Sequence, residues 1–173
     1  MKYFAFLILM LSLSFCKSIQ IQEPVKYENE TQKEGNIIKE KIEIIPHQII
    51  HVTKDEAGME YVKLLPGDKT VFRYSFRQKP DDNTLMDALL VQNILFELPE
   101  KIKNTNLKDE ELKSVNLTAQ ILGFRNARLI KIDKGSLKIK IIDKQNMEVQ
   151  IDLDDSYSML PKKHIKQSIS LKK

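Results

Sequence analysis

The chain has 173 residues, of which 42% are hydrophobic and 30% are charged, and its formal net charge is +4 at pH 7. This composition is sufficient for one packed core with a soluble surface, and the length leaves room for an export segment beside it. The single cysteine excludes a scaffold held by internal disulfides, so the domain must be stabilised by its core.

The first 18 residues have the pattern of a secretory signal peptide. Lys2 provides the positive start, and residues 3–15 form a run of thirteen apolar or small residues without a charge. Such a run is too short to span a bilayer as a helix, which needs about 20 residues. Removing residues 1–18 takes away Lys2 and Lys17 and no acids, so the formal net charge falls to +2. That charge is too mild to indicate nucleic-acid binding.

Two processing routes fit the end of this segment. Residues 13–16 have the outline of a bacterial lipobox, in which Cys16 would be acylated, although Phe15 stands where a small residue is usual. Alternatively, Cys16 and Ser18 are the small residues before an ordinary cleavage site, and the mature chain begins at Ile19. Both routes predict an exported protein that is periplasmic, secreted or anchored through a lipid on Cys16. Neither leaves a free thiol.

Within residues 19–40, residues 22–24 and 27–36 are almost entirely polar, with a Gly35-Asn36 breaker. A segment with so little apolar surface cannot offset the entropy of ordering, so we expect a disordered arm here. A single β-rich domain over residues 41–173 should follow it.

The first half of this domain is predicted to consist of strands. Pro46 interrupts a run of β-branched residues at 41–52, which indicates an edge strand or a bend. Pro66-Gly67 predicts a tight turn that joins strands at 59–65 and 70–77. In the second strand one face carries three aromatic residues, expected in the core, and the other face is polar. The aromatic residues are Phe72, Tyr74 and Phe76, and the opposite face has Val71, Arg73, Ser75 and Arg77.

Two segments in the middle of the chain are predicted to differ in structure. Residues 85–98 satisfy either periodicity, with Asn83 or Thr84 as a helix cap, and we favour a strand at 89–98. Residues 107–115 predict a short helix, with Asn106 as its cap and acidic residues in its first turns.

The last third shows the clearest alternation of apolar and polar residues. Strands are predicted at residues 117–122, 129–133, 136–142, 147–153 and 165–171. Gly135 and Asn146 suit tight hairpins between the second and third and between the third and fourth of these. About eight strands, one short helix and no alternation of strands with helices predict an antiparallel β-sandwich or a small β-barrel.

The sequence contains no pattern that predicts catalysis, a cofactor or a metal. His47 and His51 lie on a predicted strand, where four residues span about 13 Å, too far for one ion, and His164 is distant in sequence. Asp152, Asp154 and Asp155 form the densest acidic group, without the glycine-assisted loop that calcium prefers. There is no nucleophile elbow and no glycine-rich phosphate loop. We therefore expect a protein that is not an enzyme.

The remaining candidates are surfaces. Arg73, Arg77 and Lys79 form a basic row on the polar face of one strand and are the candidate binding surface for an acidic partner. Lys162, Lys163 and the closing Lys172-Lys173 could only assist a lipid anchor, because one lysine near anionic headgroups contributes about 1 kcal/mol.

The leader, the polar arm and the strand-rich body, which includes Gly123-Phe124 and Lys134-Gly135-Ser136, resemble the small exported β-proteins and lipoproteins of bacterial envelopes. The resemblance implies location and architecture. It favours a non-catalytic module that binds a protein or a surface polymer through a sheet face or an edge strand. The alternative is a carrier that encloses a small hydrophobic ligand in its interior.

Overall fold

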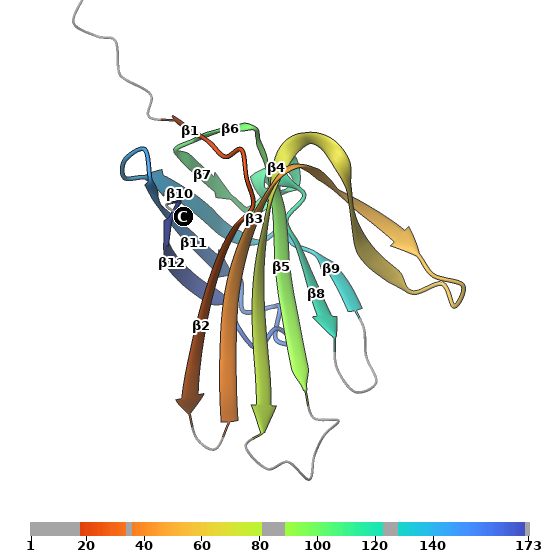
Figure 1. Cartoon of the computed structure of the whole chain (residues 1–173). Helices are drawn as coiled ribbons and strands as arrows, with labels where there is room; N and C mark the ends of the chain where they lie inside the picture. Colours follow the sequence, from red (N-terminus) through yellow and green to blue (C-terminus); the bar gives the residue numbers. More distant parts are fainter. Residues whose placement is uncertain (1–17, 34–35, 81–88, 123–127, 172–173) are drawn as a thin grey trace, which may run out of the picture.

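The computed structural model describes residues 18–33, 36–80, 89–122 and 128–171 (Figure 1). The predicted leader with Cys16, the Gly123-Phe124 pair and Lys172-Lys173 lie outside these residues.

The described residues form twelve strands and one short 3-10 helix. The strands are β1 Ser18–Gln20, β2 Val25–Lys33, β3 Asn36–Lys54, β4 Glu60–Pro80, β5 Leu90–Pro99, β6 Lys101–Lys103, β7 Thr105–Lys108, β8 Thr118–Leu122, β9 Arg128–Lys131, β10 Gly135–Ile141, β11 Asn146–Leu153 and β12 His164–Ser170. The helix η1 spans Asp109–Val115. The prediction of a mostly β protein is confirmed, although the strand number is higher than about eight.

The strands form three antiparallel sheets (Figure 1). The largest has the order β2-β3-β4-β5-β8-β9, and the second has the order β12-β11-β10-β7. A small pair, β1-β6, joins the first described strand to the segment that follows β5. Both larger sheets are open, so the described strands form no closed barrel, and the arrangement is sandwich-like.

One buried hydrophobic cluster receives side chains from both larger sheets. Its largest fully buried members from the six-stranded sheet are Ile44, Phe72, Ile94 and Phe96, and those from the four-stranded sheet are Leu137, Ile139, Met147 and Ile151. The strand alternation explains this arrangement, because every second residue of each strand points to the same face. The predicted inward face of Phe72, Tyr74 and Phe76 is confirmed.

Polar side chains also link the two sheets. Gln92 is completely buried, and its amide donates to the backbone oxygen of Lys162 at 2.7 Å and accepts from the Lys162 amide at 2.9 Å. Glu40 accepts from Lys162 Nζ at 2.9 Å and from Gln167 Nε2 at 3.1 Å. The pKa of Tyr74 is raised, first because its side chain is buried and second because the negatively charged Glu40 carboxylate lies nearby. These contacts fix β5 and β3 against the segment around β12.

Strands β3 and β4 extend beyond the sheet as a two-stranded ribbon. We call residues 48–54 of β3, residues 60–66 of β4 and the turn between them the distal hairpin. Figure 1 shows it projecting past β8 and β9. Its strands pair with each other from Gln48↔Pro66 to Lys54↔Glu60, whereas pairing of β4 with β5 begins only at Lys69.

A bulge marks the point where the distal hairpin leaves the sheet. The register shifts between Pro46 and Gln48, and His47 adopts a positive φ of 57°. Bulges of this kind place one residue in the left-handed region and bend the strand. The bend predicted from Pro46 is therefore present.

The tight turn predicted at Pro66-Gly67 is wrong, because β4 continues through these residues without reversing its direction. The chain reverses instead at residues 55–59, where Gly58 has a φ of 80° and its amide donates to Asp55 O at 3.0 Å. Gly67 is needed for a different reason. A Cβ there would collide with the Ile49 side chain on the neighbouring strand. Pairing with β3 on both sides of this point, at residues 60–66 and 70–80, overrides the local turn preference.

The structure also differs from the expectation of a disordered arm at 19–40. Strand β2 pairs with β3 from Val25↔Ile44 to Lys33↔Asn36, and Ile19 and Ile21 are buried in the shared cluster. Strand β2 is a polar edge strand. Its order comes from backbone hydrogen bonds and from cross-strand ion pairs such as Lys39–Glu30 at 2.6 Å, and it needs little apolar surface of its own.

Two further elements differ from their predictions. The helix begins only at Asp109, because Leu107 belongs to β7 and pairs with Leu137 of β10, and the helix is of the 3-10 type. Strands β9 and β10 do not form the predicted hairpin, since β9 pairs with β8 in one sheet and β10 with β11 in the other. Gly135, with a φ of 125°, lies where the chain enters β10 after crossing between sheets.

The predicted strands β5, β8, β11 and β12 and the β10–β11 hairpin are confirmed.

Candidate functional site: a charged face of the larger sheet

The face of the six-stranded sheet that points away from the shared core is charged along β2, β3 and β4. Lys41, Glu43 and Arg73 alternate with the buried Ile42, Ile44 and Phe72, so strand alternation directs them outward. The cross-strand register then places β2 and β4 residues beside β3 residues of the same face. We call this set the charged face; it consists of Lys26, Glu28, Glu30, Lys39, Lys41, Glu43, Arg73, Arg77 and Lys79.

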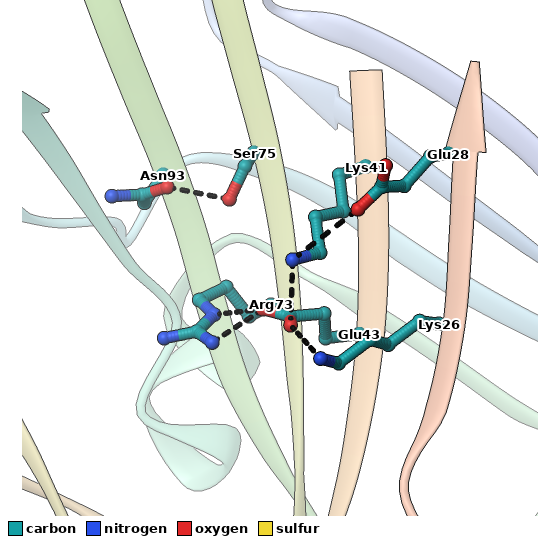
Figure 2. Close-up of polar contacts among 7 residues, drawn as sticks. All are labelled: Lys26, Glu28, Lys41, Glu43, Arg73, Ser75 and Asn93. Atoms are coloured by element: carbon teal, nitrogen blue, oxygen red, sulfur yellow. Dashed lines mark hydrogen bonds and ion pairs between the residues drawn. The ribbon is translucent and has the colours of Figure 1, made fainter. Parts of the chain in front are cut away.

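Glu43 is the centre of an ion-pair network on this face (Figure 2). Arg73 pairs with Glu43 Oε2 through two guanidinium nitrogens, and its Nε lies 2.6 Å from that oxygen. Lys41 Nζ lies 2.9 Å and Lys26 Nζ 4.0 Å from Glu43 Oε1. Lys41 also lies 3.5 Å from Glu28. One carboxylate therefore orders three cations that come from three neighbouring strands.

Glu43 is almost fully buried, and the residue as a whole is 6% exposed. Burial alone would raise the pKa of Glu43, but the hydrogen bonds and charges of Lys41 and Arg73 outweigh it and hold the pKa below its usual range. Glu43 is therefore ionised at neutral pH. The network is a fixed part of the surface and not a proton-transfer group.

The charged face has a surplus of positive charge. It carries six cations and three carboxylates, and Arg77 and Lys79 are exposed without an ion-pair partner among the described residues. Beside Arg77 lies a depression of about 200 Å³, whose lining has three carboxylates, Glu28, Glu30 and Glu40, and three cations, Lys39, Lys41 and Arg77. Ser75 Oγ donates to Asn93 Oδ1 at 2.6 Å at the next strand (Figure 2). This arrangement can bind an anionic group without a metal or a cofactor.

The three residues of the predicted basic row lie on one strand, but they differ in their ion-pair contacts. Arg73 points to the predicted face but is engaged with Glu43, whereas Arg77 and Lys79 are available. Glu43 was not identified from the sequence as the partner of Arg73. Glu43 was detectable only as an acid on the outward side of a predicted strand, because its partner Arg73 is thirty positions away.

The histidine and acidic residues that were considered as metal ligands or catalytic groups do not come together in one site within the described residues. His47 and His51 are both exposed, and the bulge separates them. His164 Nδ1 lies 3.2 Å from Asp152 Oδ1, Asp155 pairs with Lys163, and Lys162 pairs with Glu40. Within the described ranges, no cluster of three or more histidine, cysteine or acidic residues could hold a metal ion.

Comparison with known proteins gave no relationship, since no family model, no curated protein and no solved structure matches this chain. The described part of the chain also has no helix of the length and apolar character needed to cross a bilayer.

Proposed function

We propose that this protein is an exported, non-catalytic module of a bacterial envelope that binds an anionic surface polymer through the charged face. The observation that carries the proposal is the surplus of cations on an ordered, polar sheet face, with Arg77 and Lys79 unpaired among the described residues.

The chemistry of the face favours a polymer over a protein as the partner. Protein interfaces usually rely on buried aromatic or aliphatic anchors. None of the exposed large hydrophobic residues of the described chain belongs to the charged face; Tyr27 lies on β2 but alternates with Lys26 and Glu28, and the others are Met59, Tyr61, Leu89, Leu122, Ile142 and Met159. A flexible polyanion needs only regularly placed cations and hydrogen-bond donors.

The packed interior favours a binding module over an interior carrier. The inner faces of both larger sheets carry fully buried side chains, among them Ile94 and Phe96 of the six-stranded sheet and Ile139 and Met147 of the four-stranded sheet. A carrier that encloses its ligand there would need a cavity of about 300 Å³ or more.

The first test replaces the unpaired cations. We expect the double variant Arg77→Gln/Lys79→Gln to bind heparin, a soluble polyanion, about tenfold more weakly at low salt, because each lost ionic contact contributes about 0.5–1 kcal/mol. Binding of the unchanged protein should fall as salt is added. Both quantities can be measured by isothermal titration calorimetry.

The matched control is Lys138→Gln/Lys140→Gln, which makes the same change in net charge on the exposed side of β10. This control should bind heparin like the unchanged protein. An equal loss in both double variants would show a general effect of net charge, and an absence of binding at low salt would remove the proposal.

Export is tested on the protein purified from its own cells. We expect intact-mass measurement to show that residues 1–15 are absent and that Cys16 carries acyl chains, or that the chain begins at Ile19 without an adduct. The first result would make the protein a membrane-tethered module, and the second a soluble one. An intact chain that begins at Met1 would contradict export by this leader.

A further inference from the structure

A second surface of the molecule lies beneath the distal hairpin. Ile50 and Val52 of this hairpin face residues of β8, β9 and the end of η1 across a cleft of about 370 Å³. We call it the hairpin cleft. Its lining residues are Ile50, Val52, Lys113, Asn116, Leu117, Thr118, Lys131, Ile132 and Asp133.

The buried carboxylate of Glu97 holds one wall of this cleft in place. Glu97 accepts a hydrogen bond from the backbone amide of Ile50, a second from Lys69 Nζ at 2.6 Å and a third from Asn116 Nδ2 at 2.9 Å. Strand β4 also comes within 8 Å of β9, Cα to Cα. Because β5 and β8 separate β9 from the part of β4 inside the sheet, the approaching part is the distal hairpin.

The walls of the cleft are largely apolar. Ile50 and Val52 form the hairpin side, and Leu117 and Ile132 contribute from the body of the domain. The volume lies in the range of sites for small molecules, about 300–1,000 Å³. The cleft can therefore receive an aliphatic chain of modest length.

Two polar groups of the cleft are suited to an anion. Thr118 and Lys131 are cross-strand partners of β8 and β9, so their side chains lie next to each other on one face. Thr118 is 4% exposed, and its buried hydroxyl has no hydrogen-bond partner among the described residues. Lys131 is exposed and has no ion-pair partner among them. A buried hydroxyl is normally hydrogen-bonded, so an acceptor is missing here.

The remaining charges do not oppose an anion. Asp133 is the only acid in the cleft lining described here; Lys113 lies 4.0 Å from it, and Tyr157 donates to it at 2.9 Å. The hydrogen bond with Glu110 raises the pKa of Lys113, so this lysine is charged at neutral pH. Two cations and one acid therefore line the cleft, and since Lys113 also pairs with Glu110, Lys131 is the cation left to attract an anion.

We propose that the hairpin cleft binds a small amphipathic carboxylate, with its aliphatic part against Ile50 and Val52 and its carboxylate at Thr118 and Lys131. This site is distinct from the charged face, because Thr118 and Lys131 belong to β8 and β9 and the charged face to β2, β3 and β4.

The test is a calorimetric titration of the purified protein with dodecanoate and, separately, with dodecyltrimethylammonium, both below their micelle concentrations. We expect saturable binding of one dodecanoate per chain and weaker binding of the cationic probe. Thr118→Val and Lys131→Gln should each weaken dodecanoate binding about fivefold, as expected for one lost hydrogen bond or ionic contact.

Thr118→Val should not destabilise the free protein, because it removes a buried hydroxyl that has no partner among the described residues. Lys138→Gln, on the exposed side of β10, is the control and should leave binding unchanged. Equal binding of both probes, equal affinity of all variants or an absence of saturable binding would overturn the proposal. The heparin affinity of Arg77→Gln/Lys79→Gln is an independent readout, so failure of one proposal is distinguishable from failure of the other.

Discussion

Replacement of Glu97 by alanine is expected to lower the free energy of unfolding by about 3 kcal/mol, because it removes one member of a buried, hydrogen-bonded charge group. Glu97 is 2% exposed and connects three separate segments, through Ile50, Lys69 and Asn116. The loss should lie at the low end for such groups, since Lys69 is partly exposed and can be hydrated. Denaturant unfolding measures this change.

The same substitution should act locally on the distal hairpin. Without Glu97, the Ile50 amide loses its acceptor, so hydrogen exchange of residues 48–54 should accelerate more than exchange in β10 and β11. Glu97→Gln preserves the shape and one acceptor and should cost less than the alanine variant. Glu100→Ala is the control, because its contact with Gln20 is exposed. Uniform acceleration across the domain would show that Glu97 does not specifically hold the hairpin.

Replacement of Phe72 by alanine is expected to lower the free energy of unfolding by about 4 kcal/mol, through lost burial and the cavity left behind. Phe72 is 2% exposed and stacks on Phe96, its cross-strand partner, with an interplanar angle of 9°. Phe72→Leu should cost less, because more of the volume is retained. Chemical denaturation of both variants gives the comparison.

Tyr61→Ala is the control for aromatic content, since Tyr61 lies on the distal hairpin and is 39% exposed. A change within about 0.5 kcal/mol is expected there. A double-mutant cycle between Phe72 and Phe96 should reveal a coupling of about 1 kcal/mol from the ring contact. A loss below about 1.5 kcal/mol for Phe72→Ala would contradict the assignment of these rings to the main core.

The strands that the sequence predicts best are those whose pattern is local. In β10, Leu137, Ile139 and Ile141 are buried and Lys138 and Lys140 are exposed, as the alternation predicts. The burial of Phe72 and Tyr74 is predicted for the same reason. Period-two alternation depends only on neighbouring residues, so it is visible without knowledge of the partner strand.

The predictions that fail depend on partners distant in sequence. Strand β2 is polar and becomes ordered by pairing with β3, so its own composition indicates disorder. The alternation at 129–133 and 136–142 is real, but it does not reveal that β9 and β10 belong to different sheets. The turn residues Pro66 and Gly67 instead serve a bend, because β3 continues beside them.

In the candidate site, too, the local pattern predicts which way a side chain points, but not which distant residue it contacts. The outward position of Arg73 and Arg77 follows from alternation, but the partner that engages Arg73 depends on the β3–β4 register. The hairpin cleft could not be predicted from the sequence, because it requires the distal hairpin to lie against β8 and β9.

The bulge at Pro46–Gln48 gives the distal hairpin the mechanics of a lever. Residues 48–54 extend about 20 Å at about 3.3 Å per residue, so a rotation of about 10° at this fulcrum moves the tip by about 3–4 Å. Glu97 holds the lever at Ile50, only two residues from the fulcrum. A small change in the length of that contact is therefore magnified about threefold at the tip, where Met59 and Tyr61 are exposed.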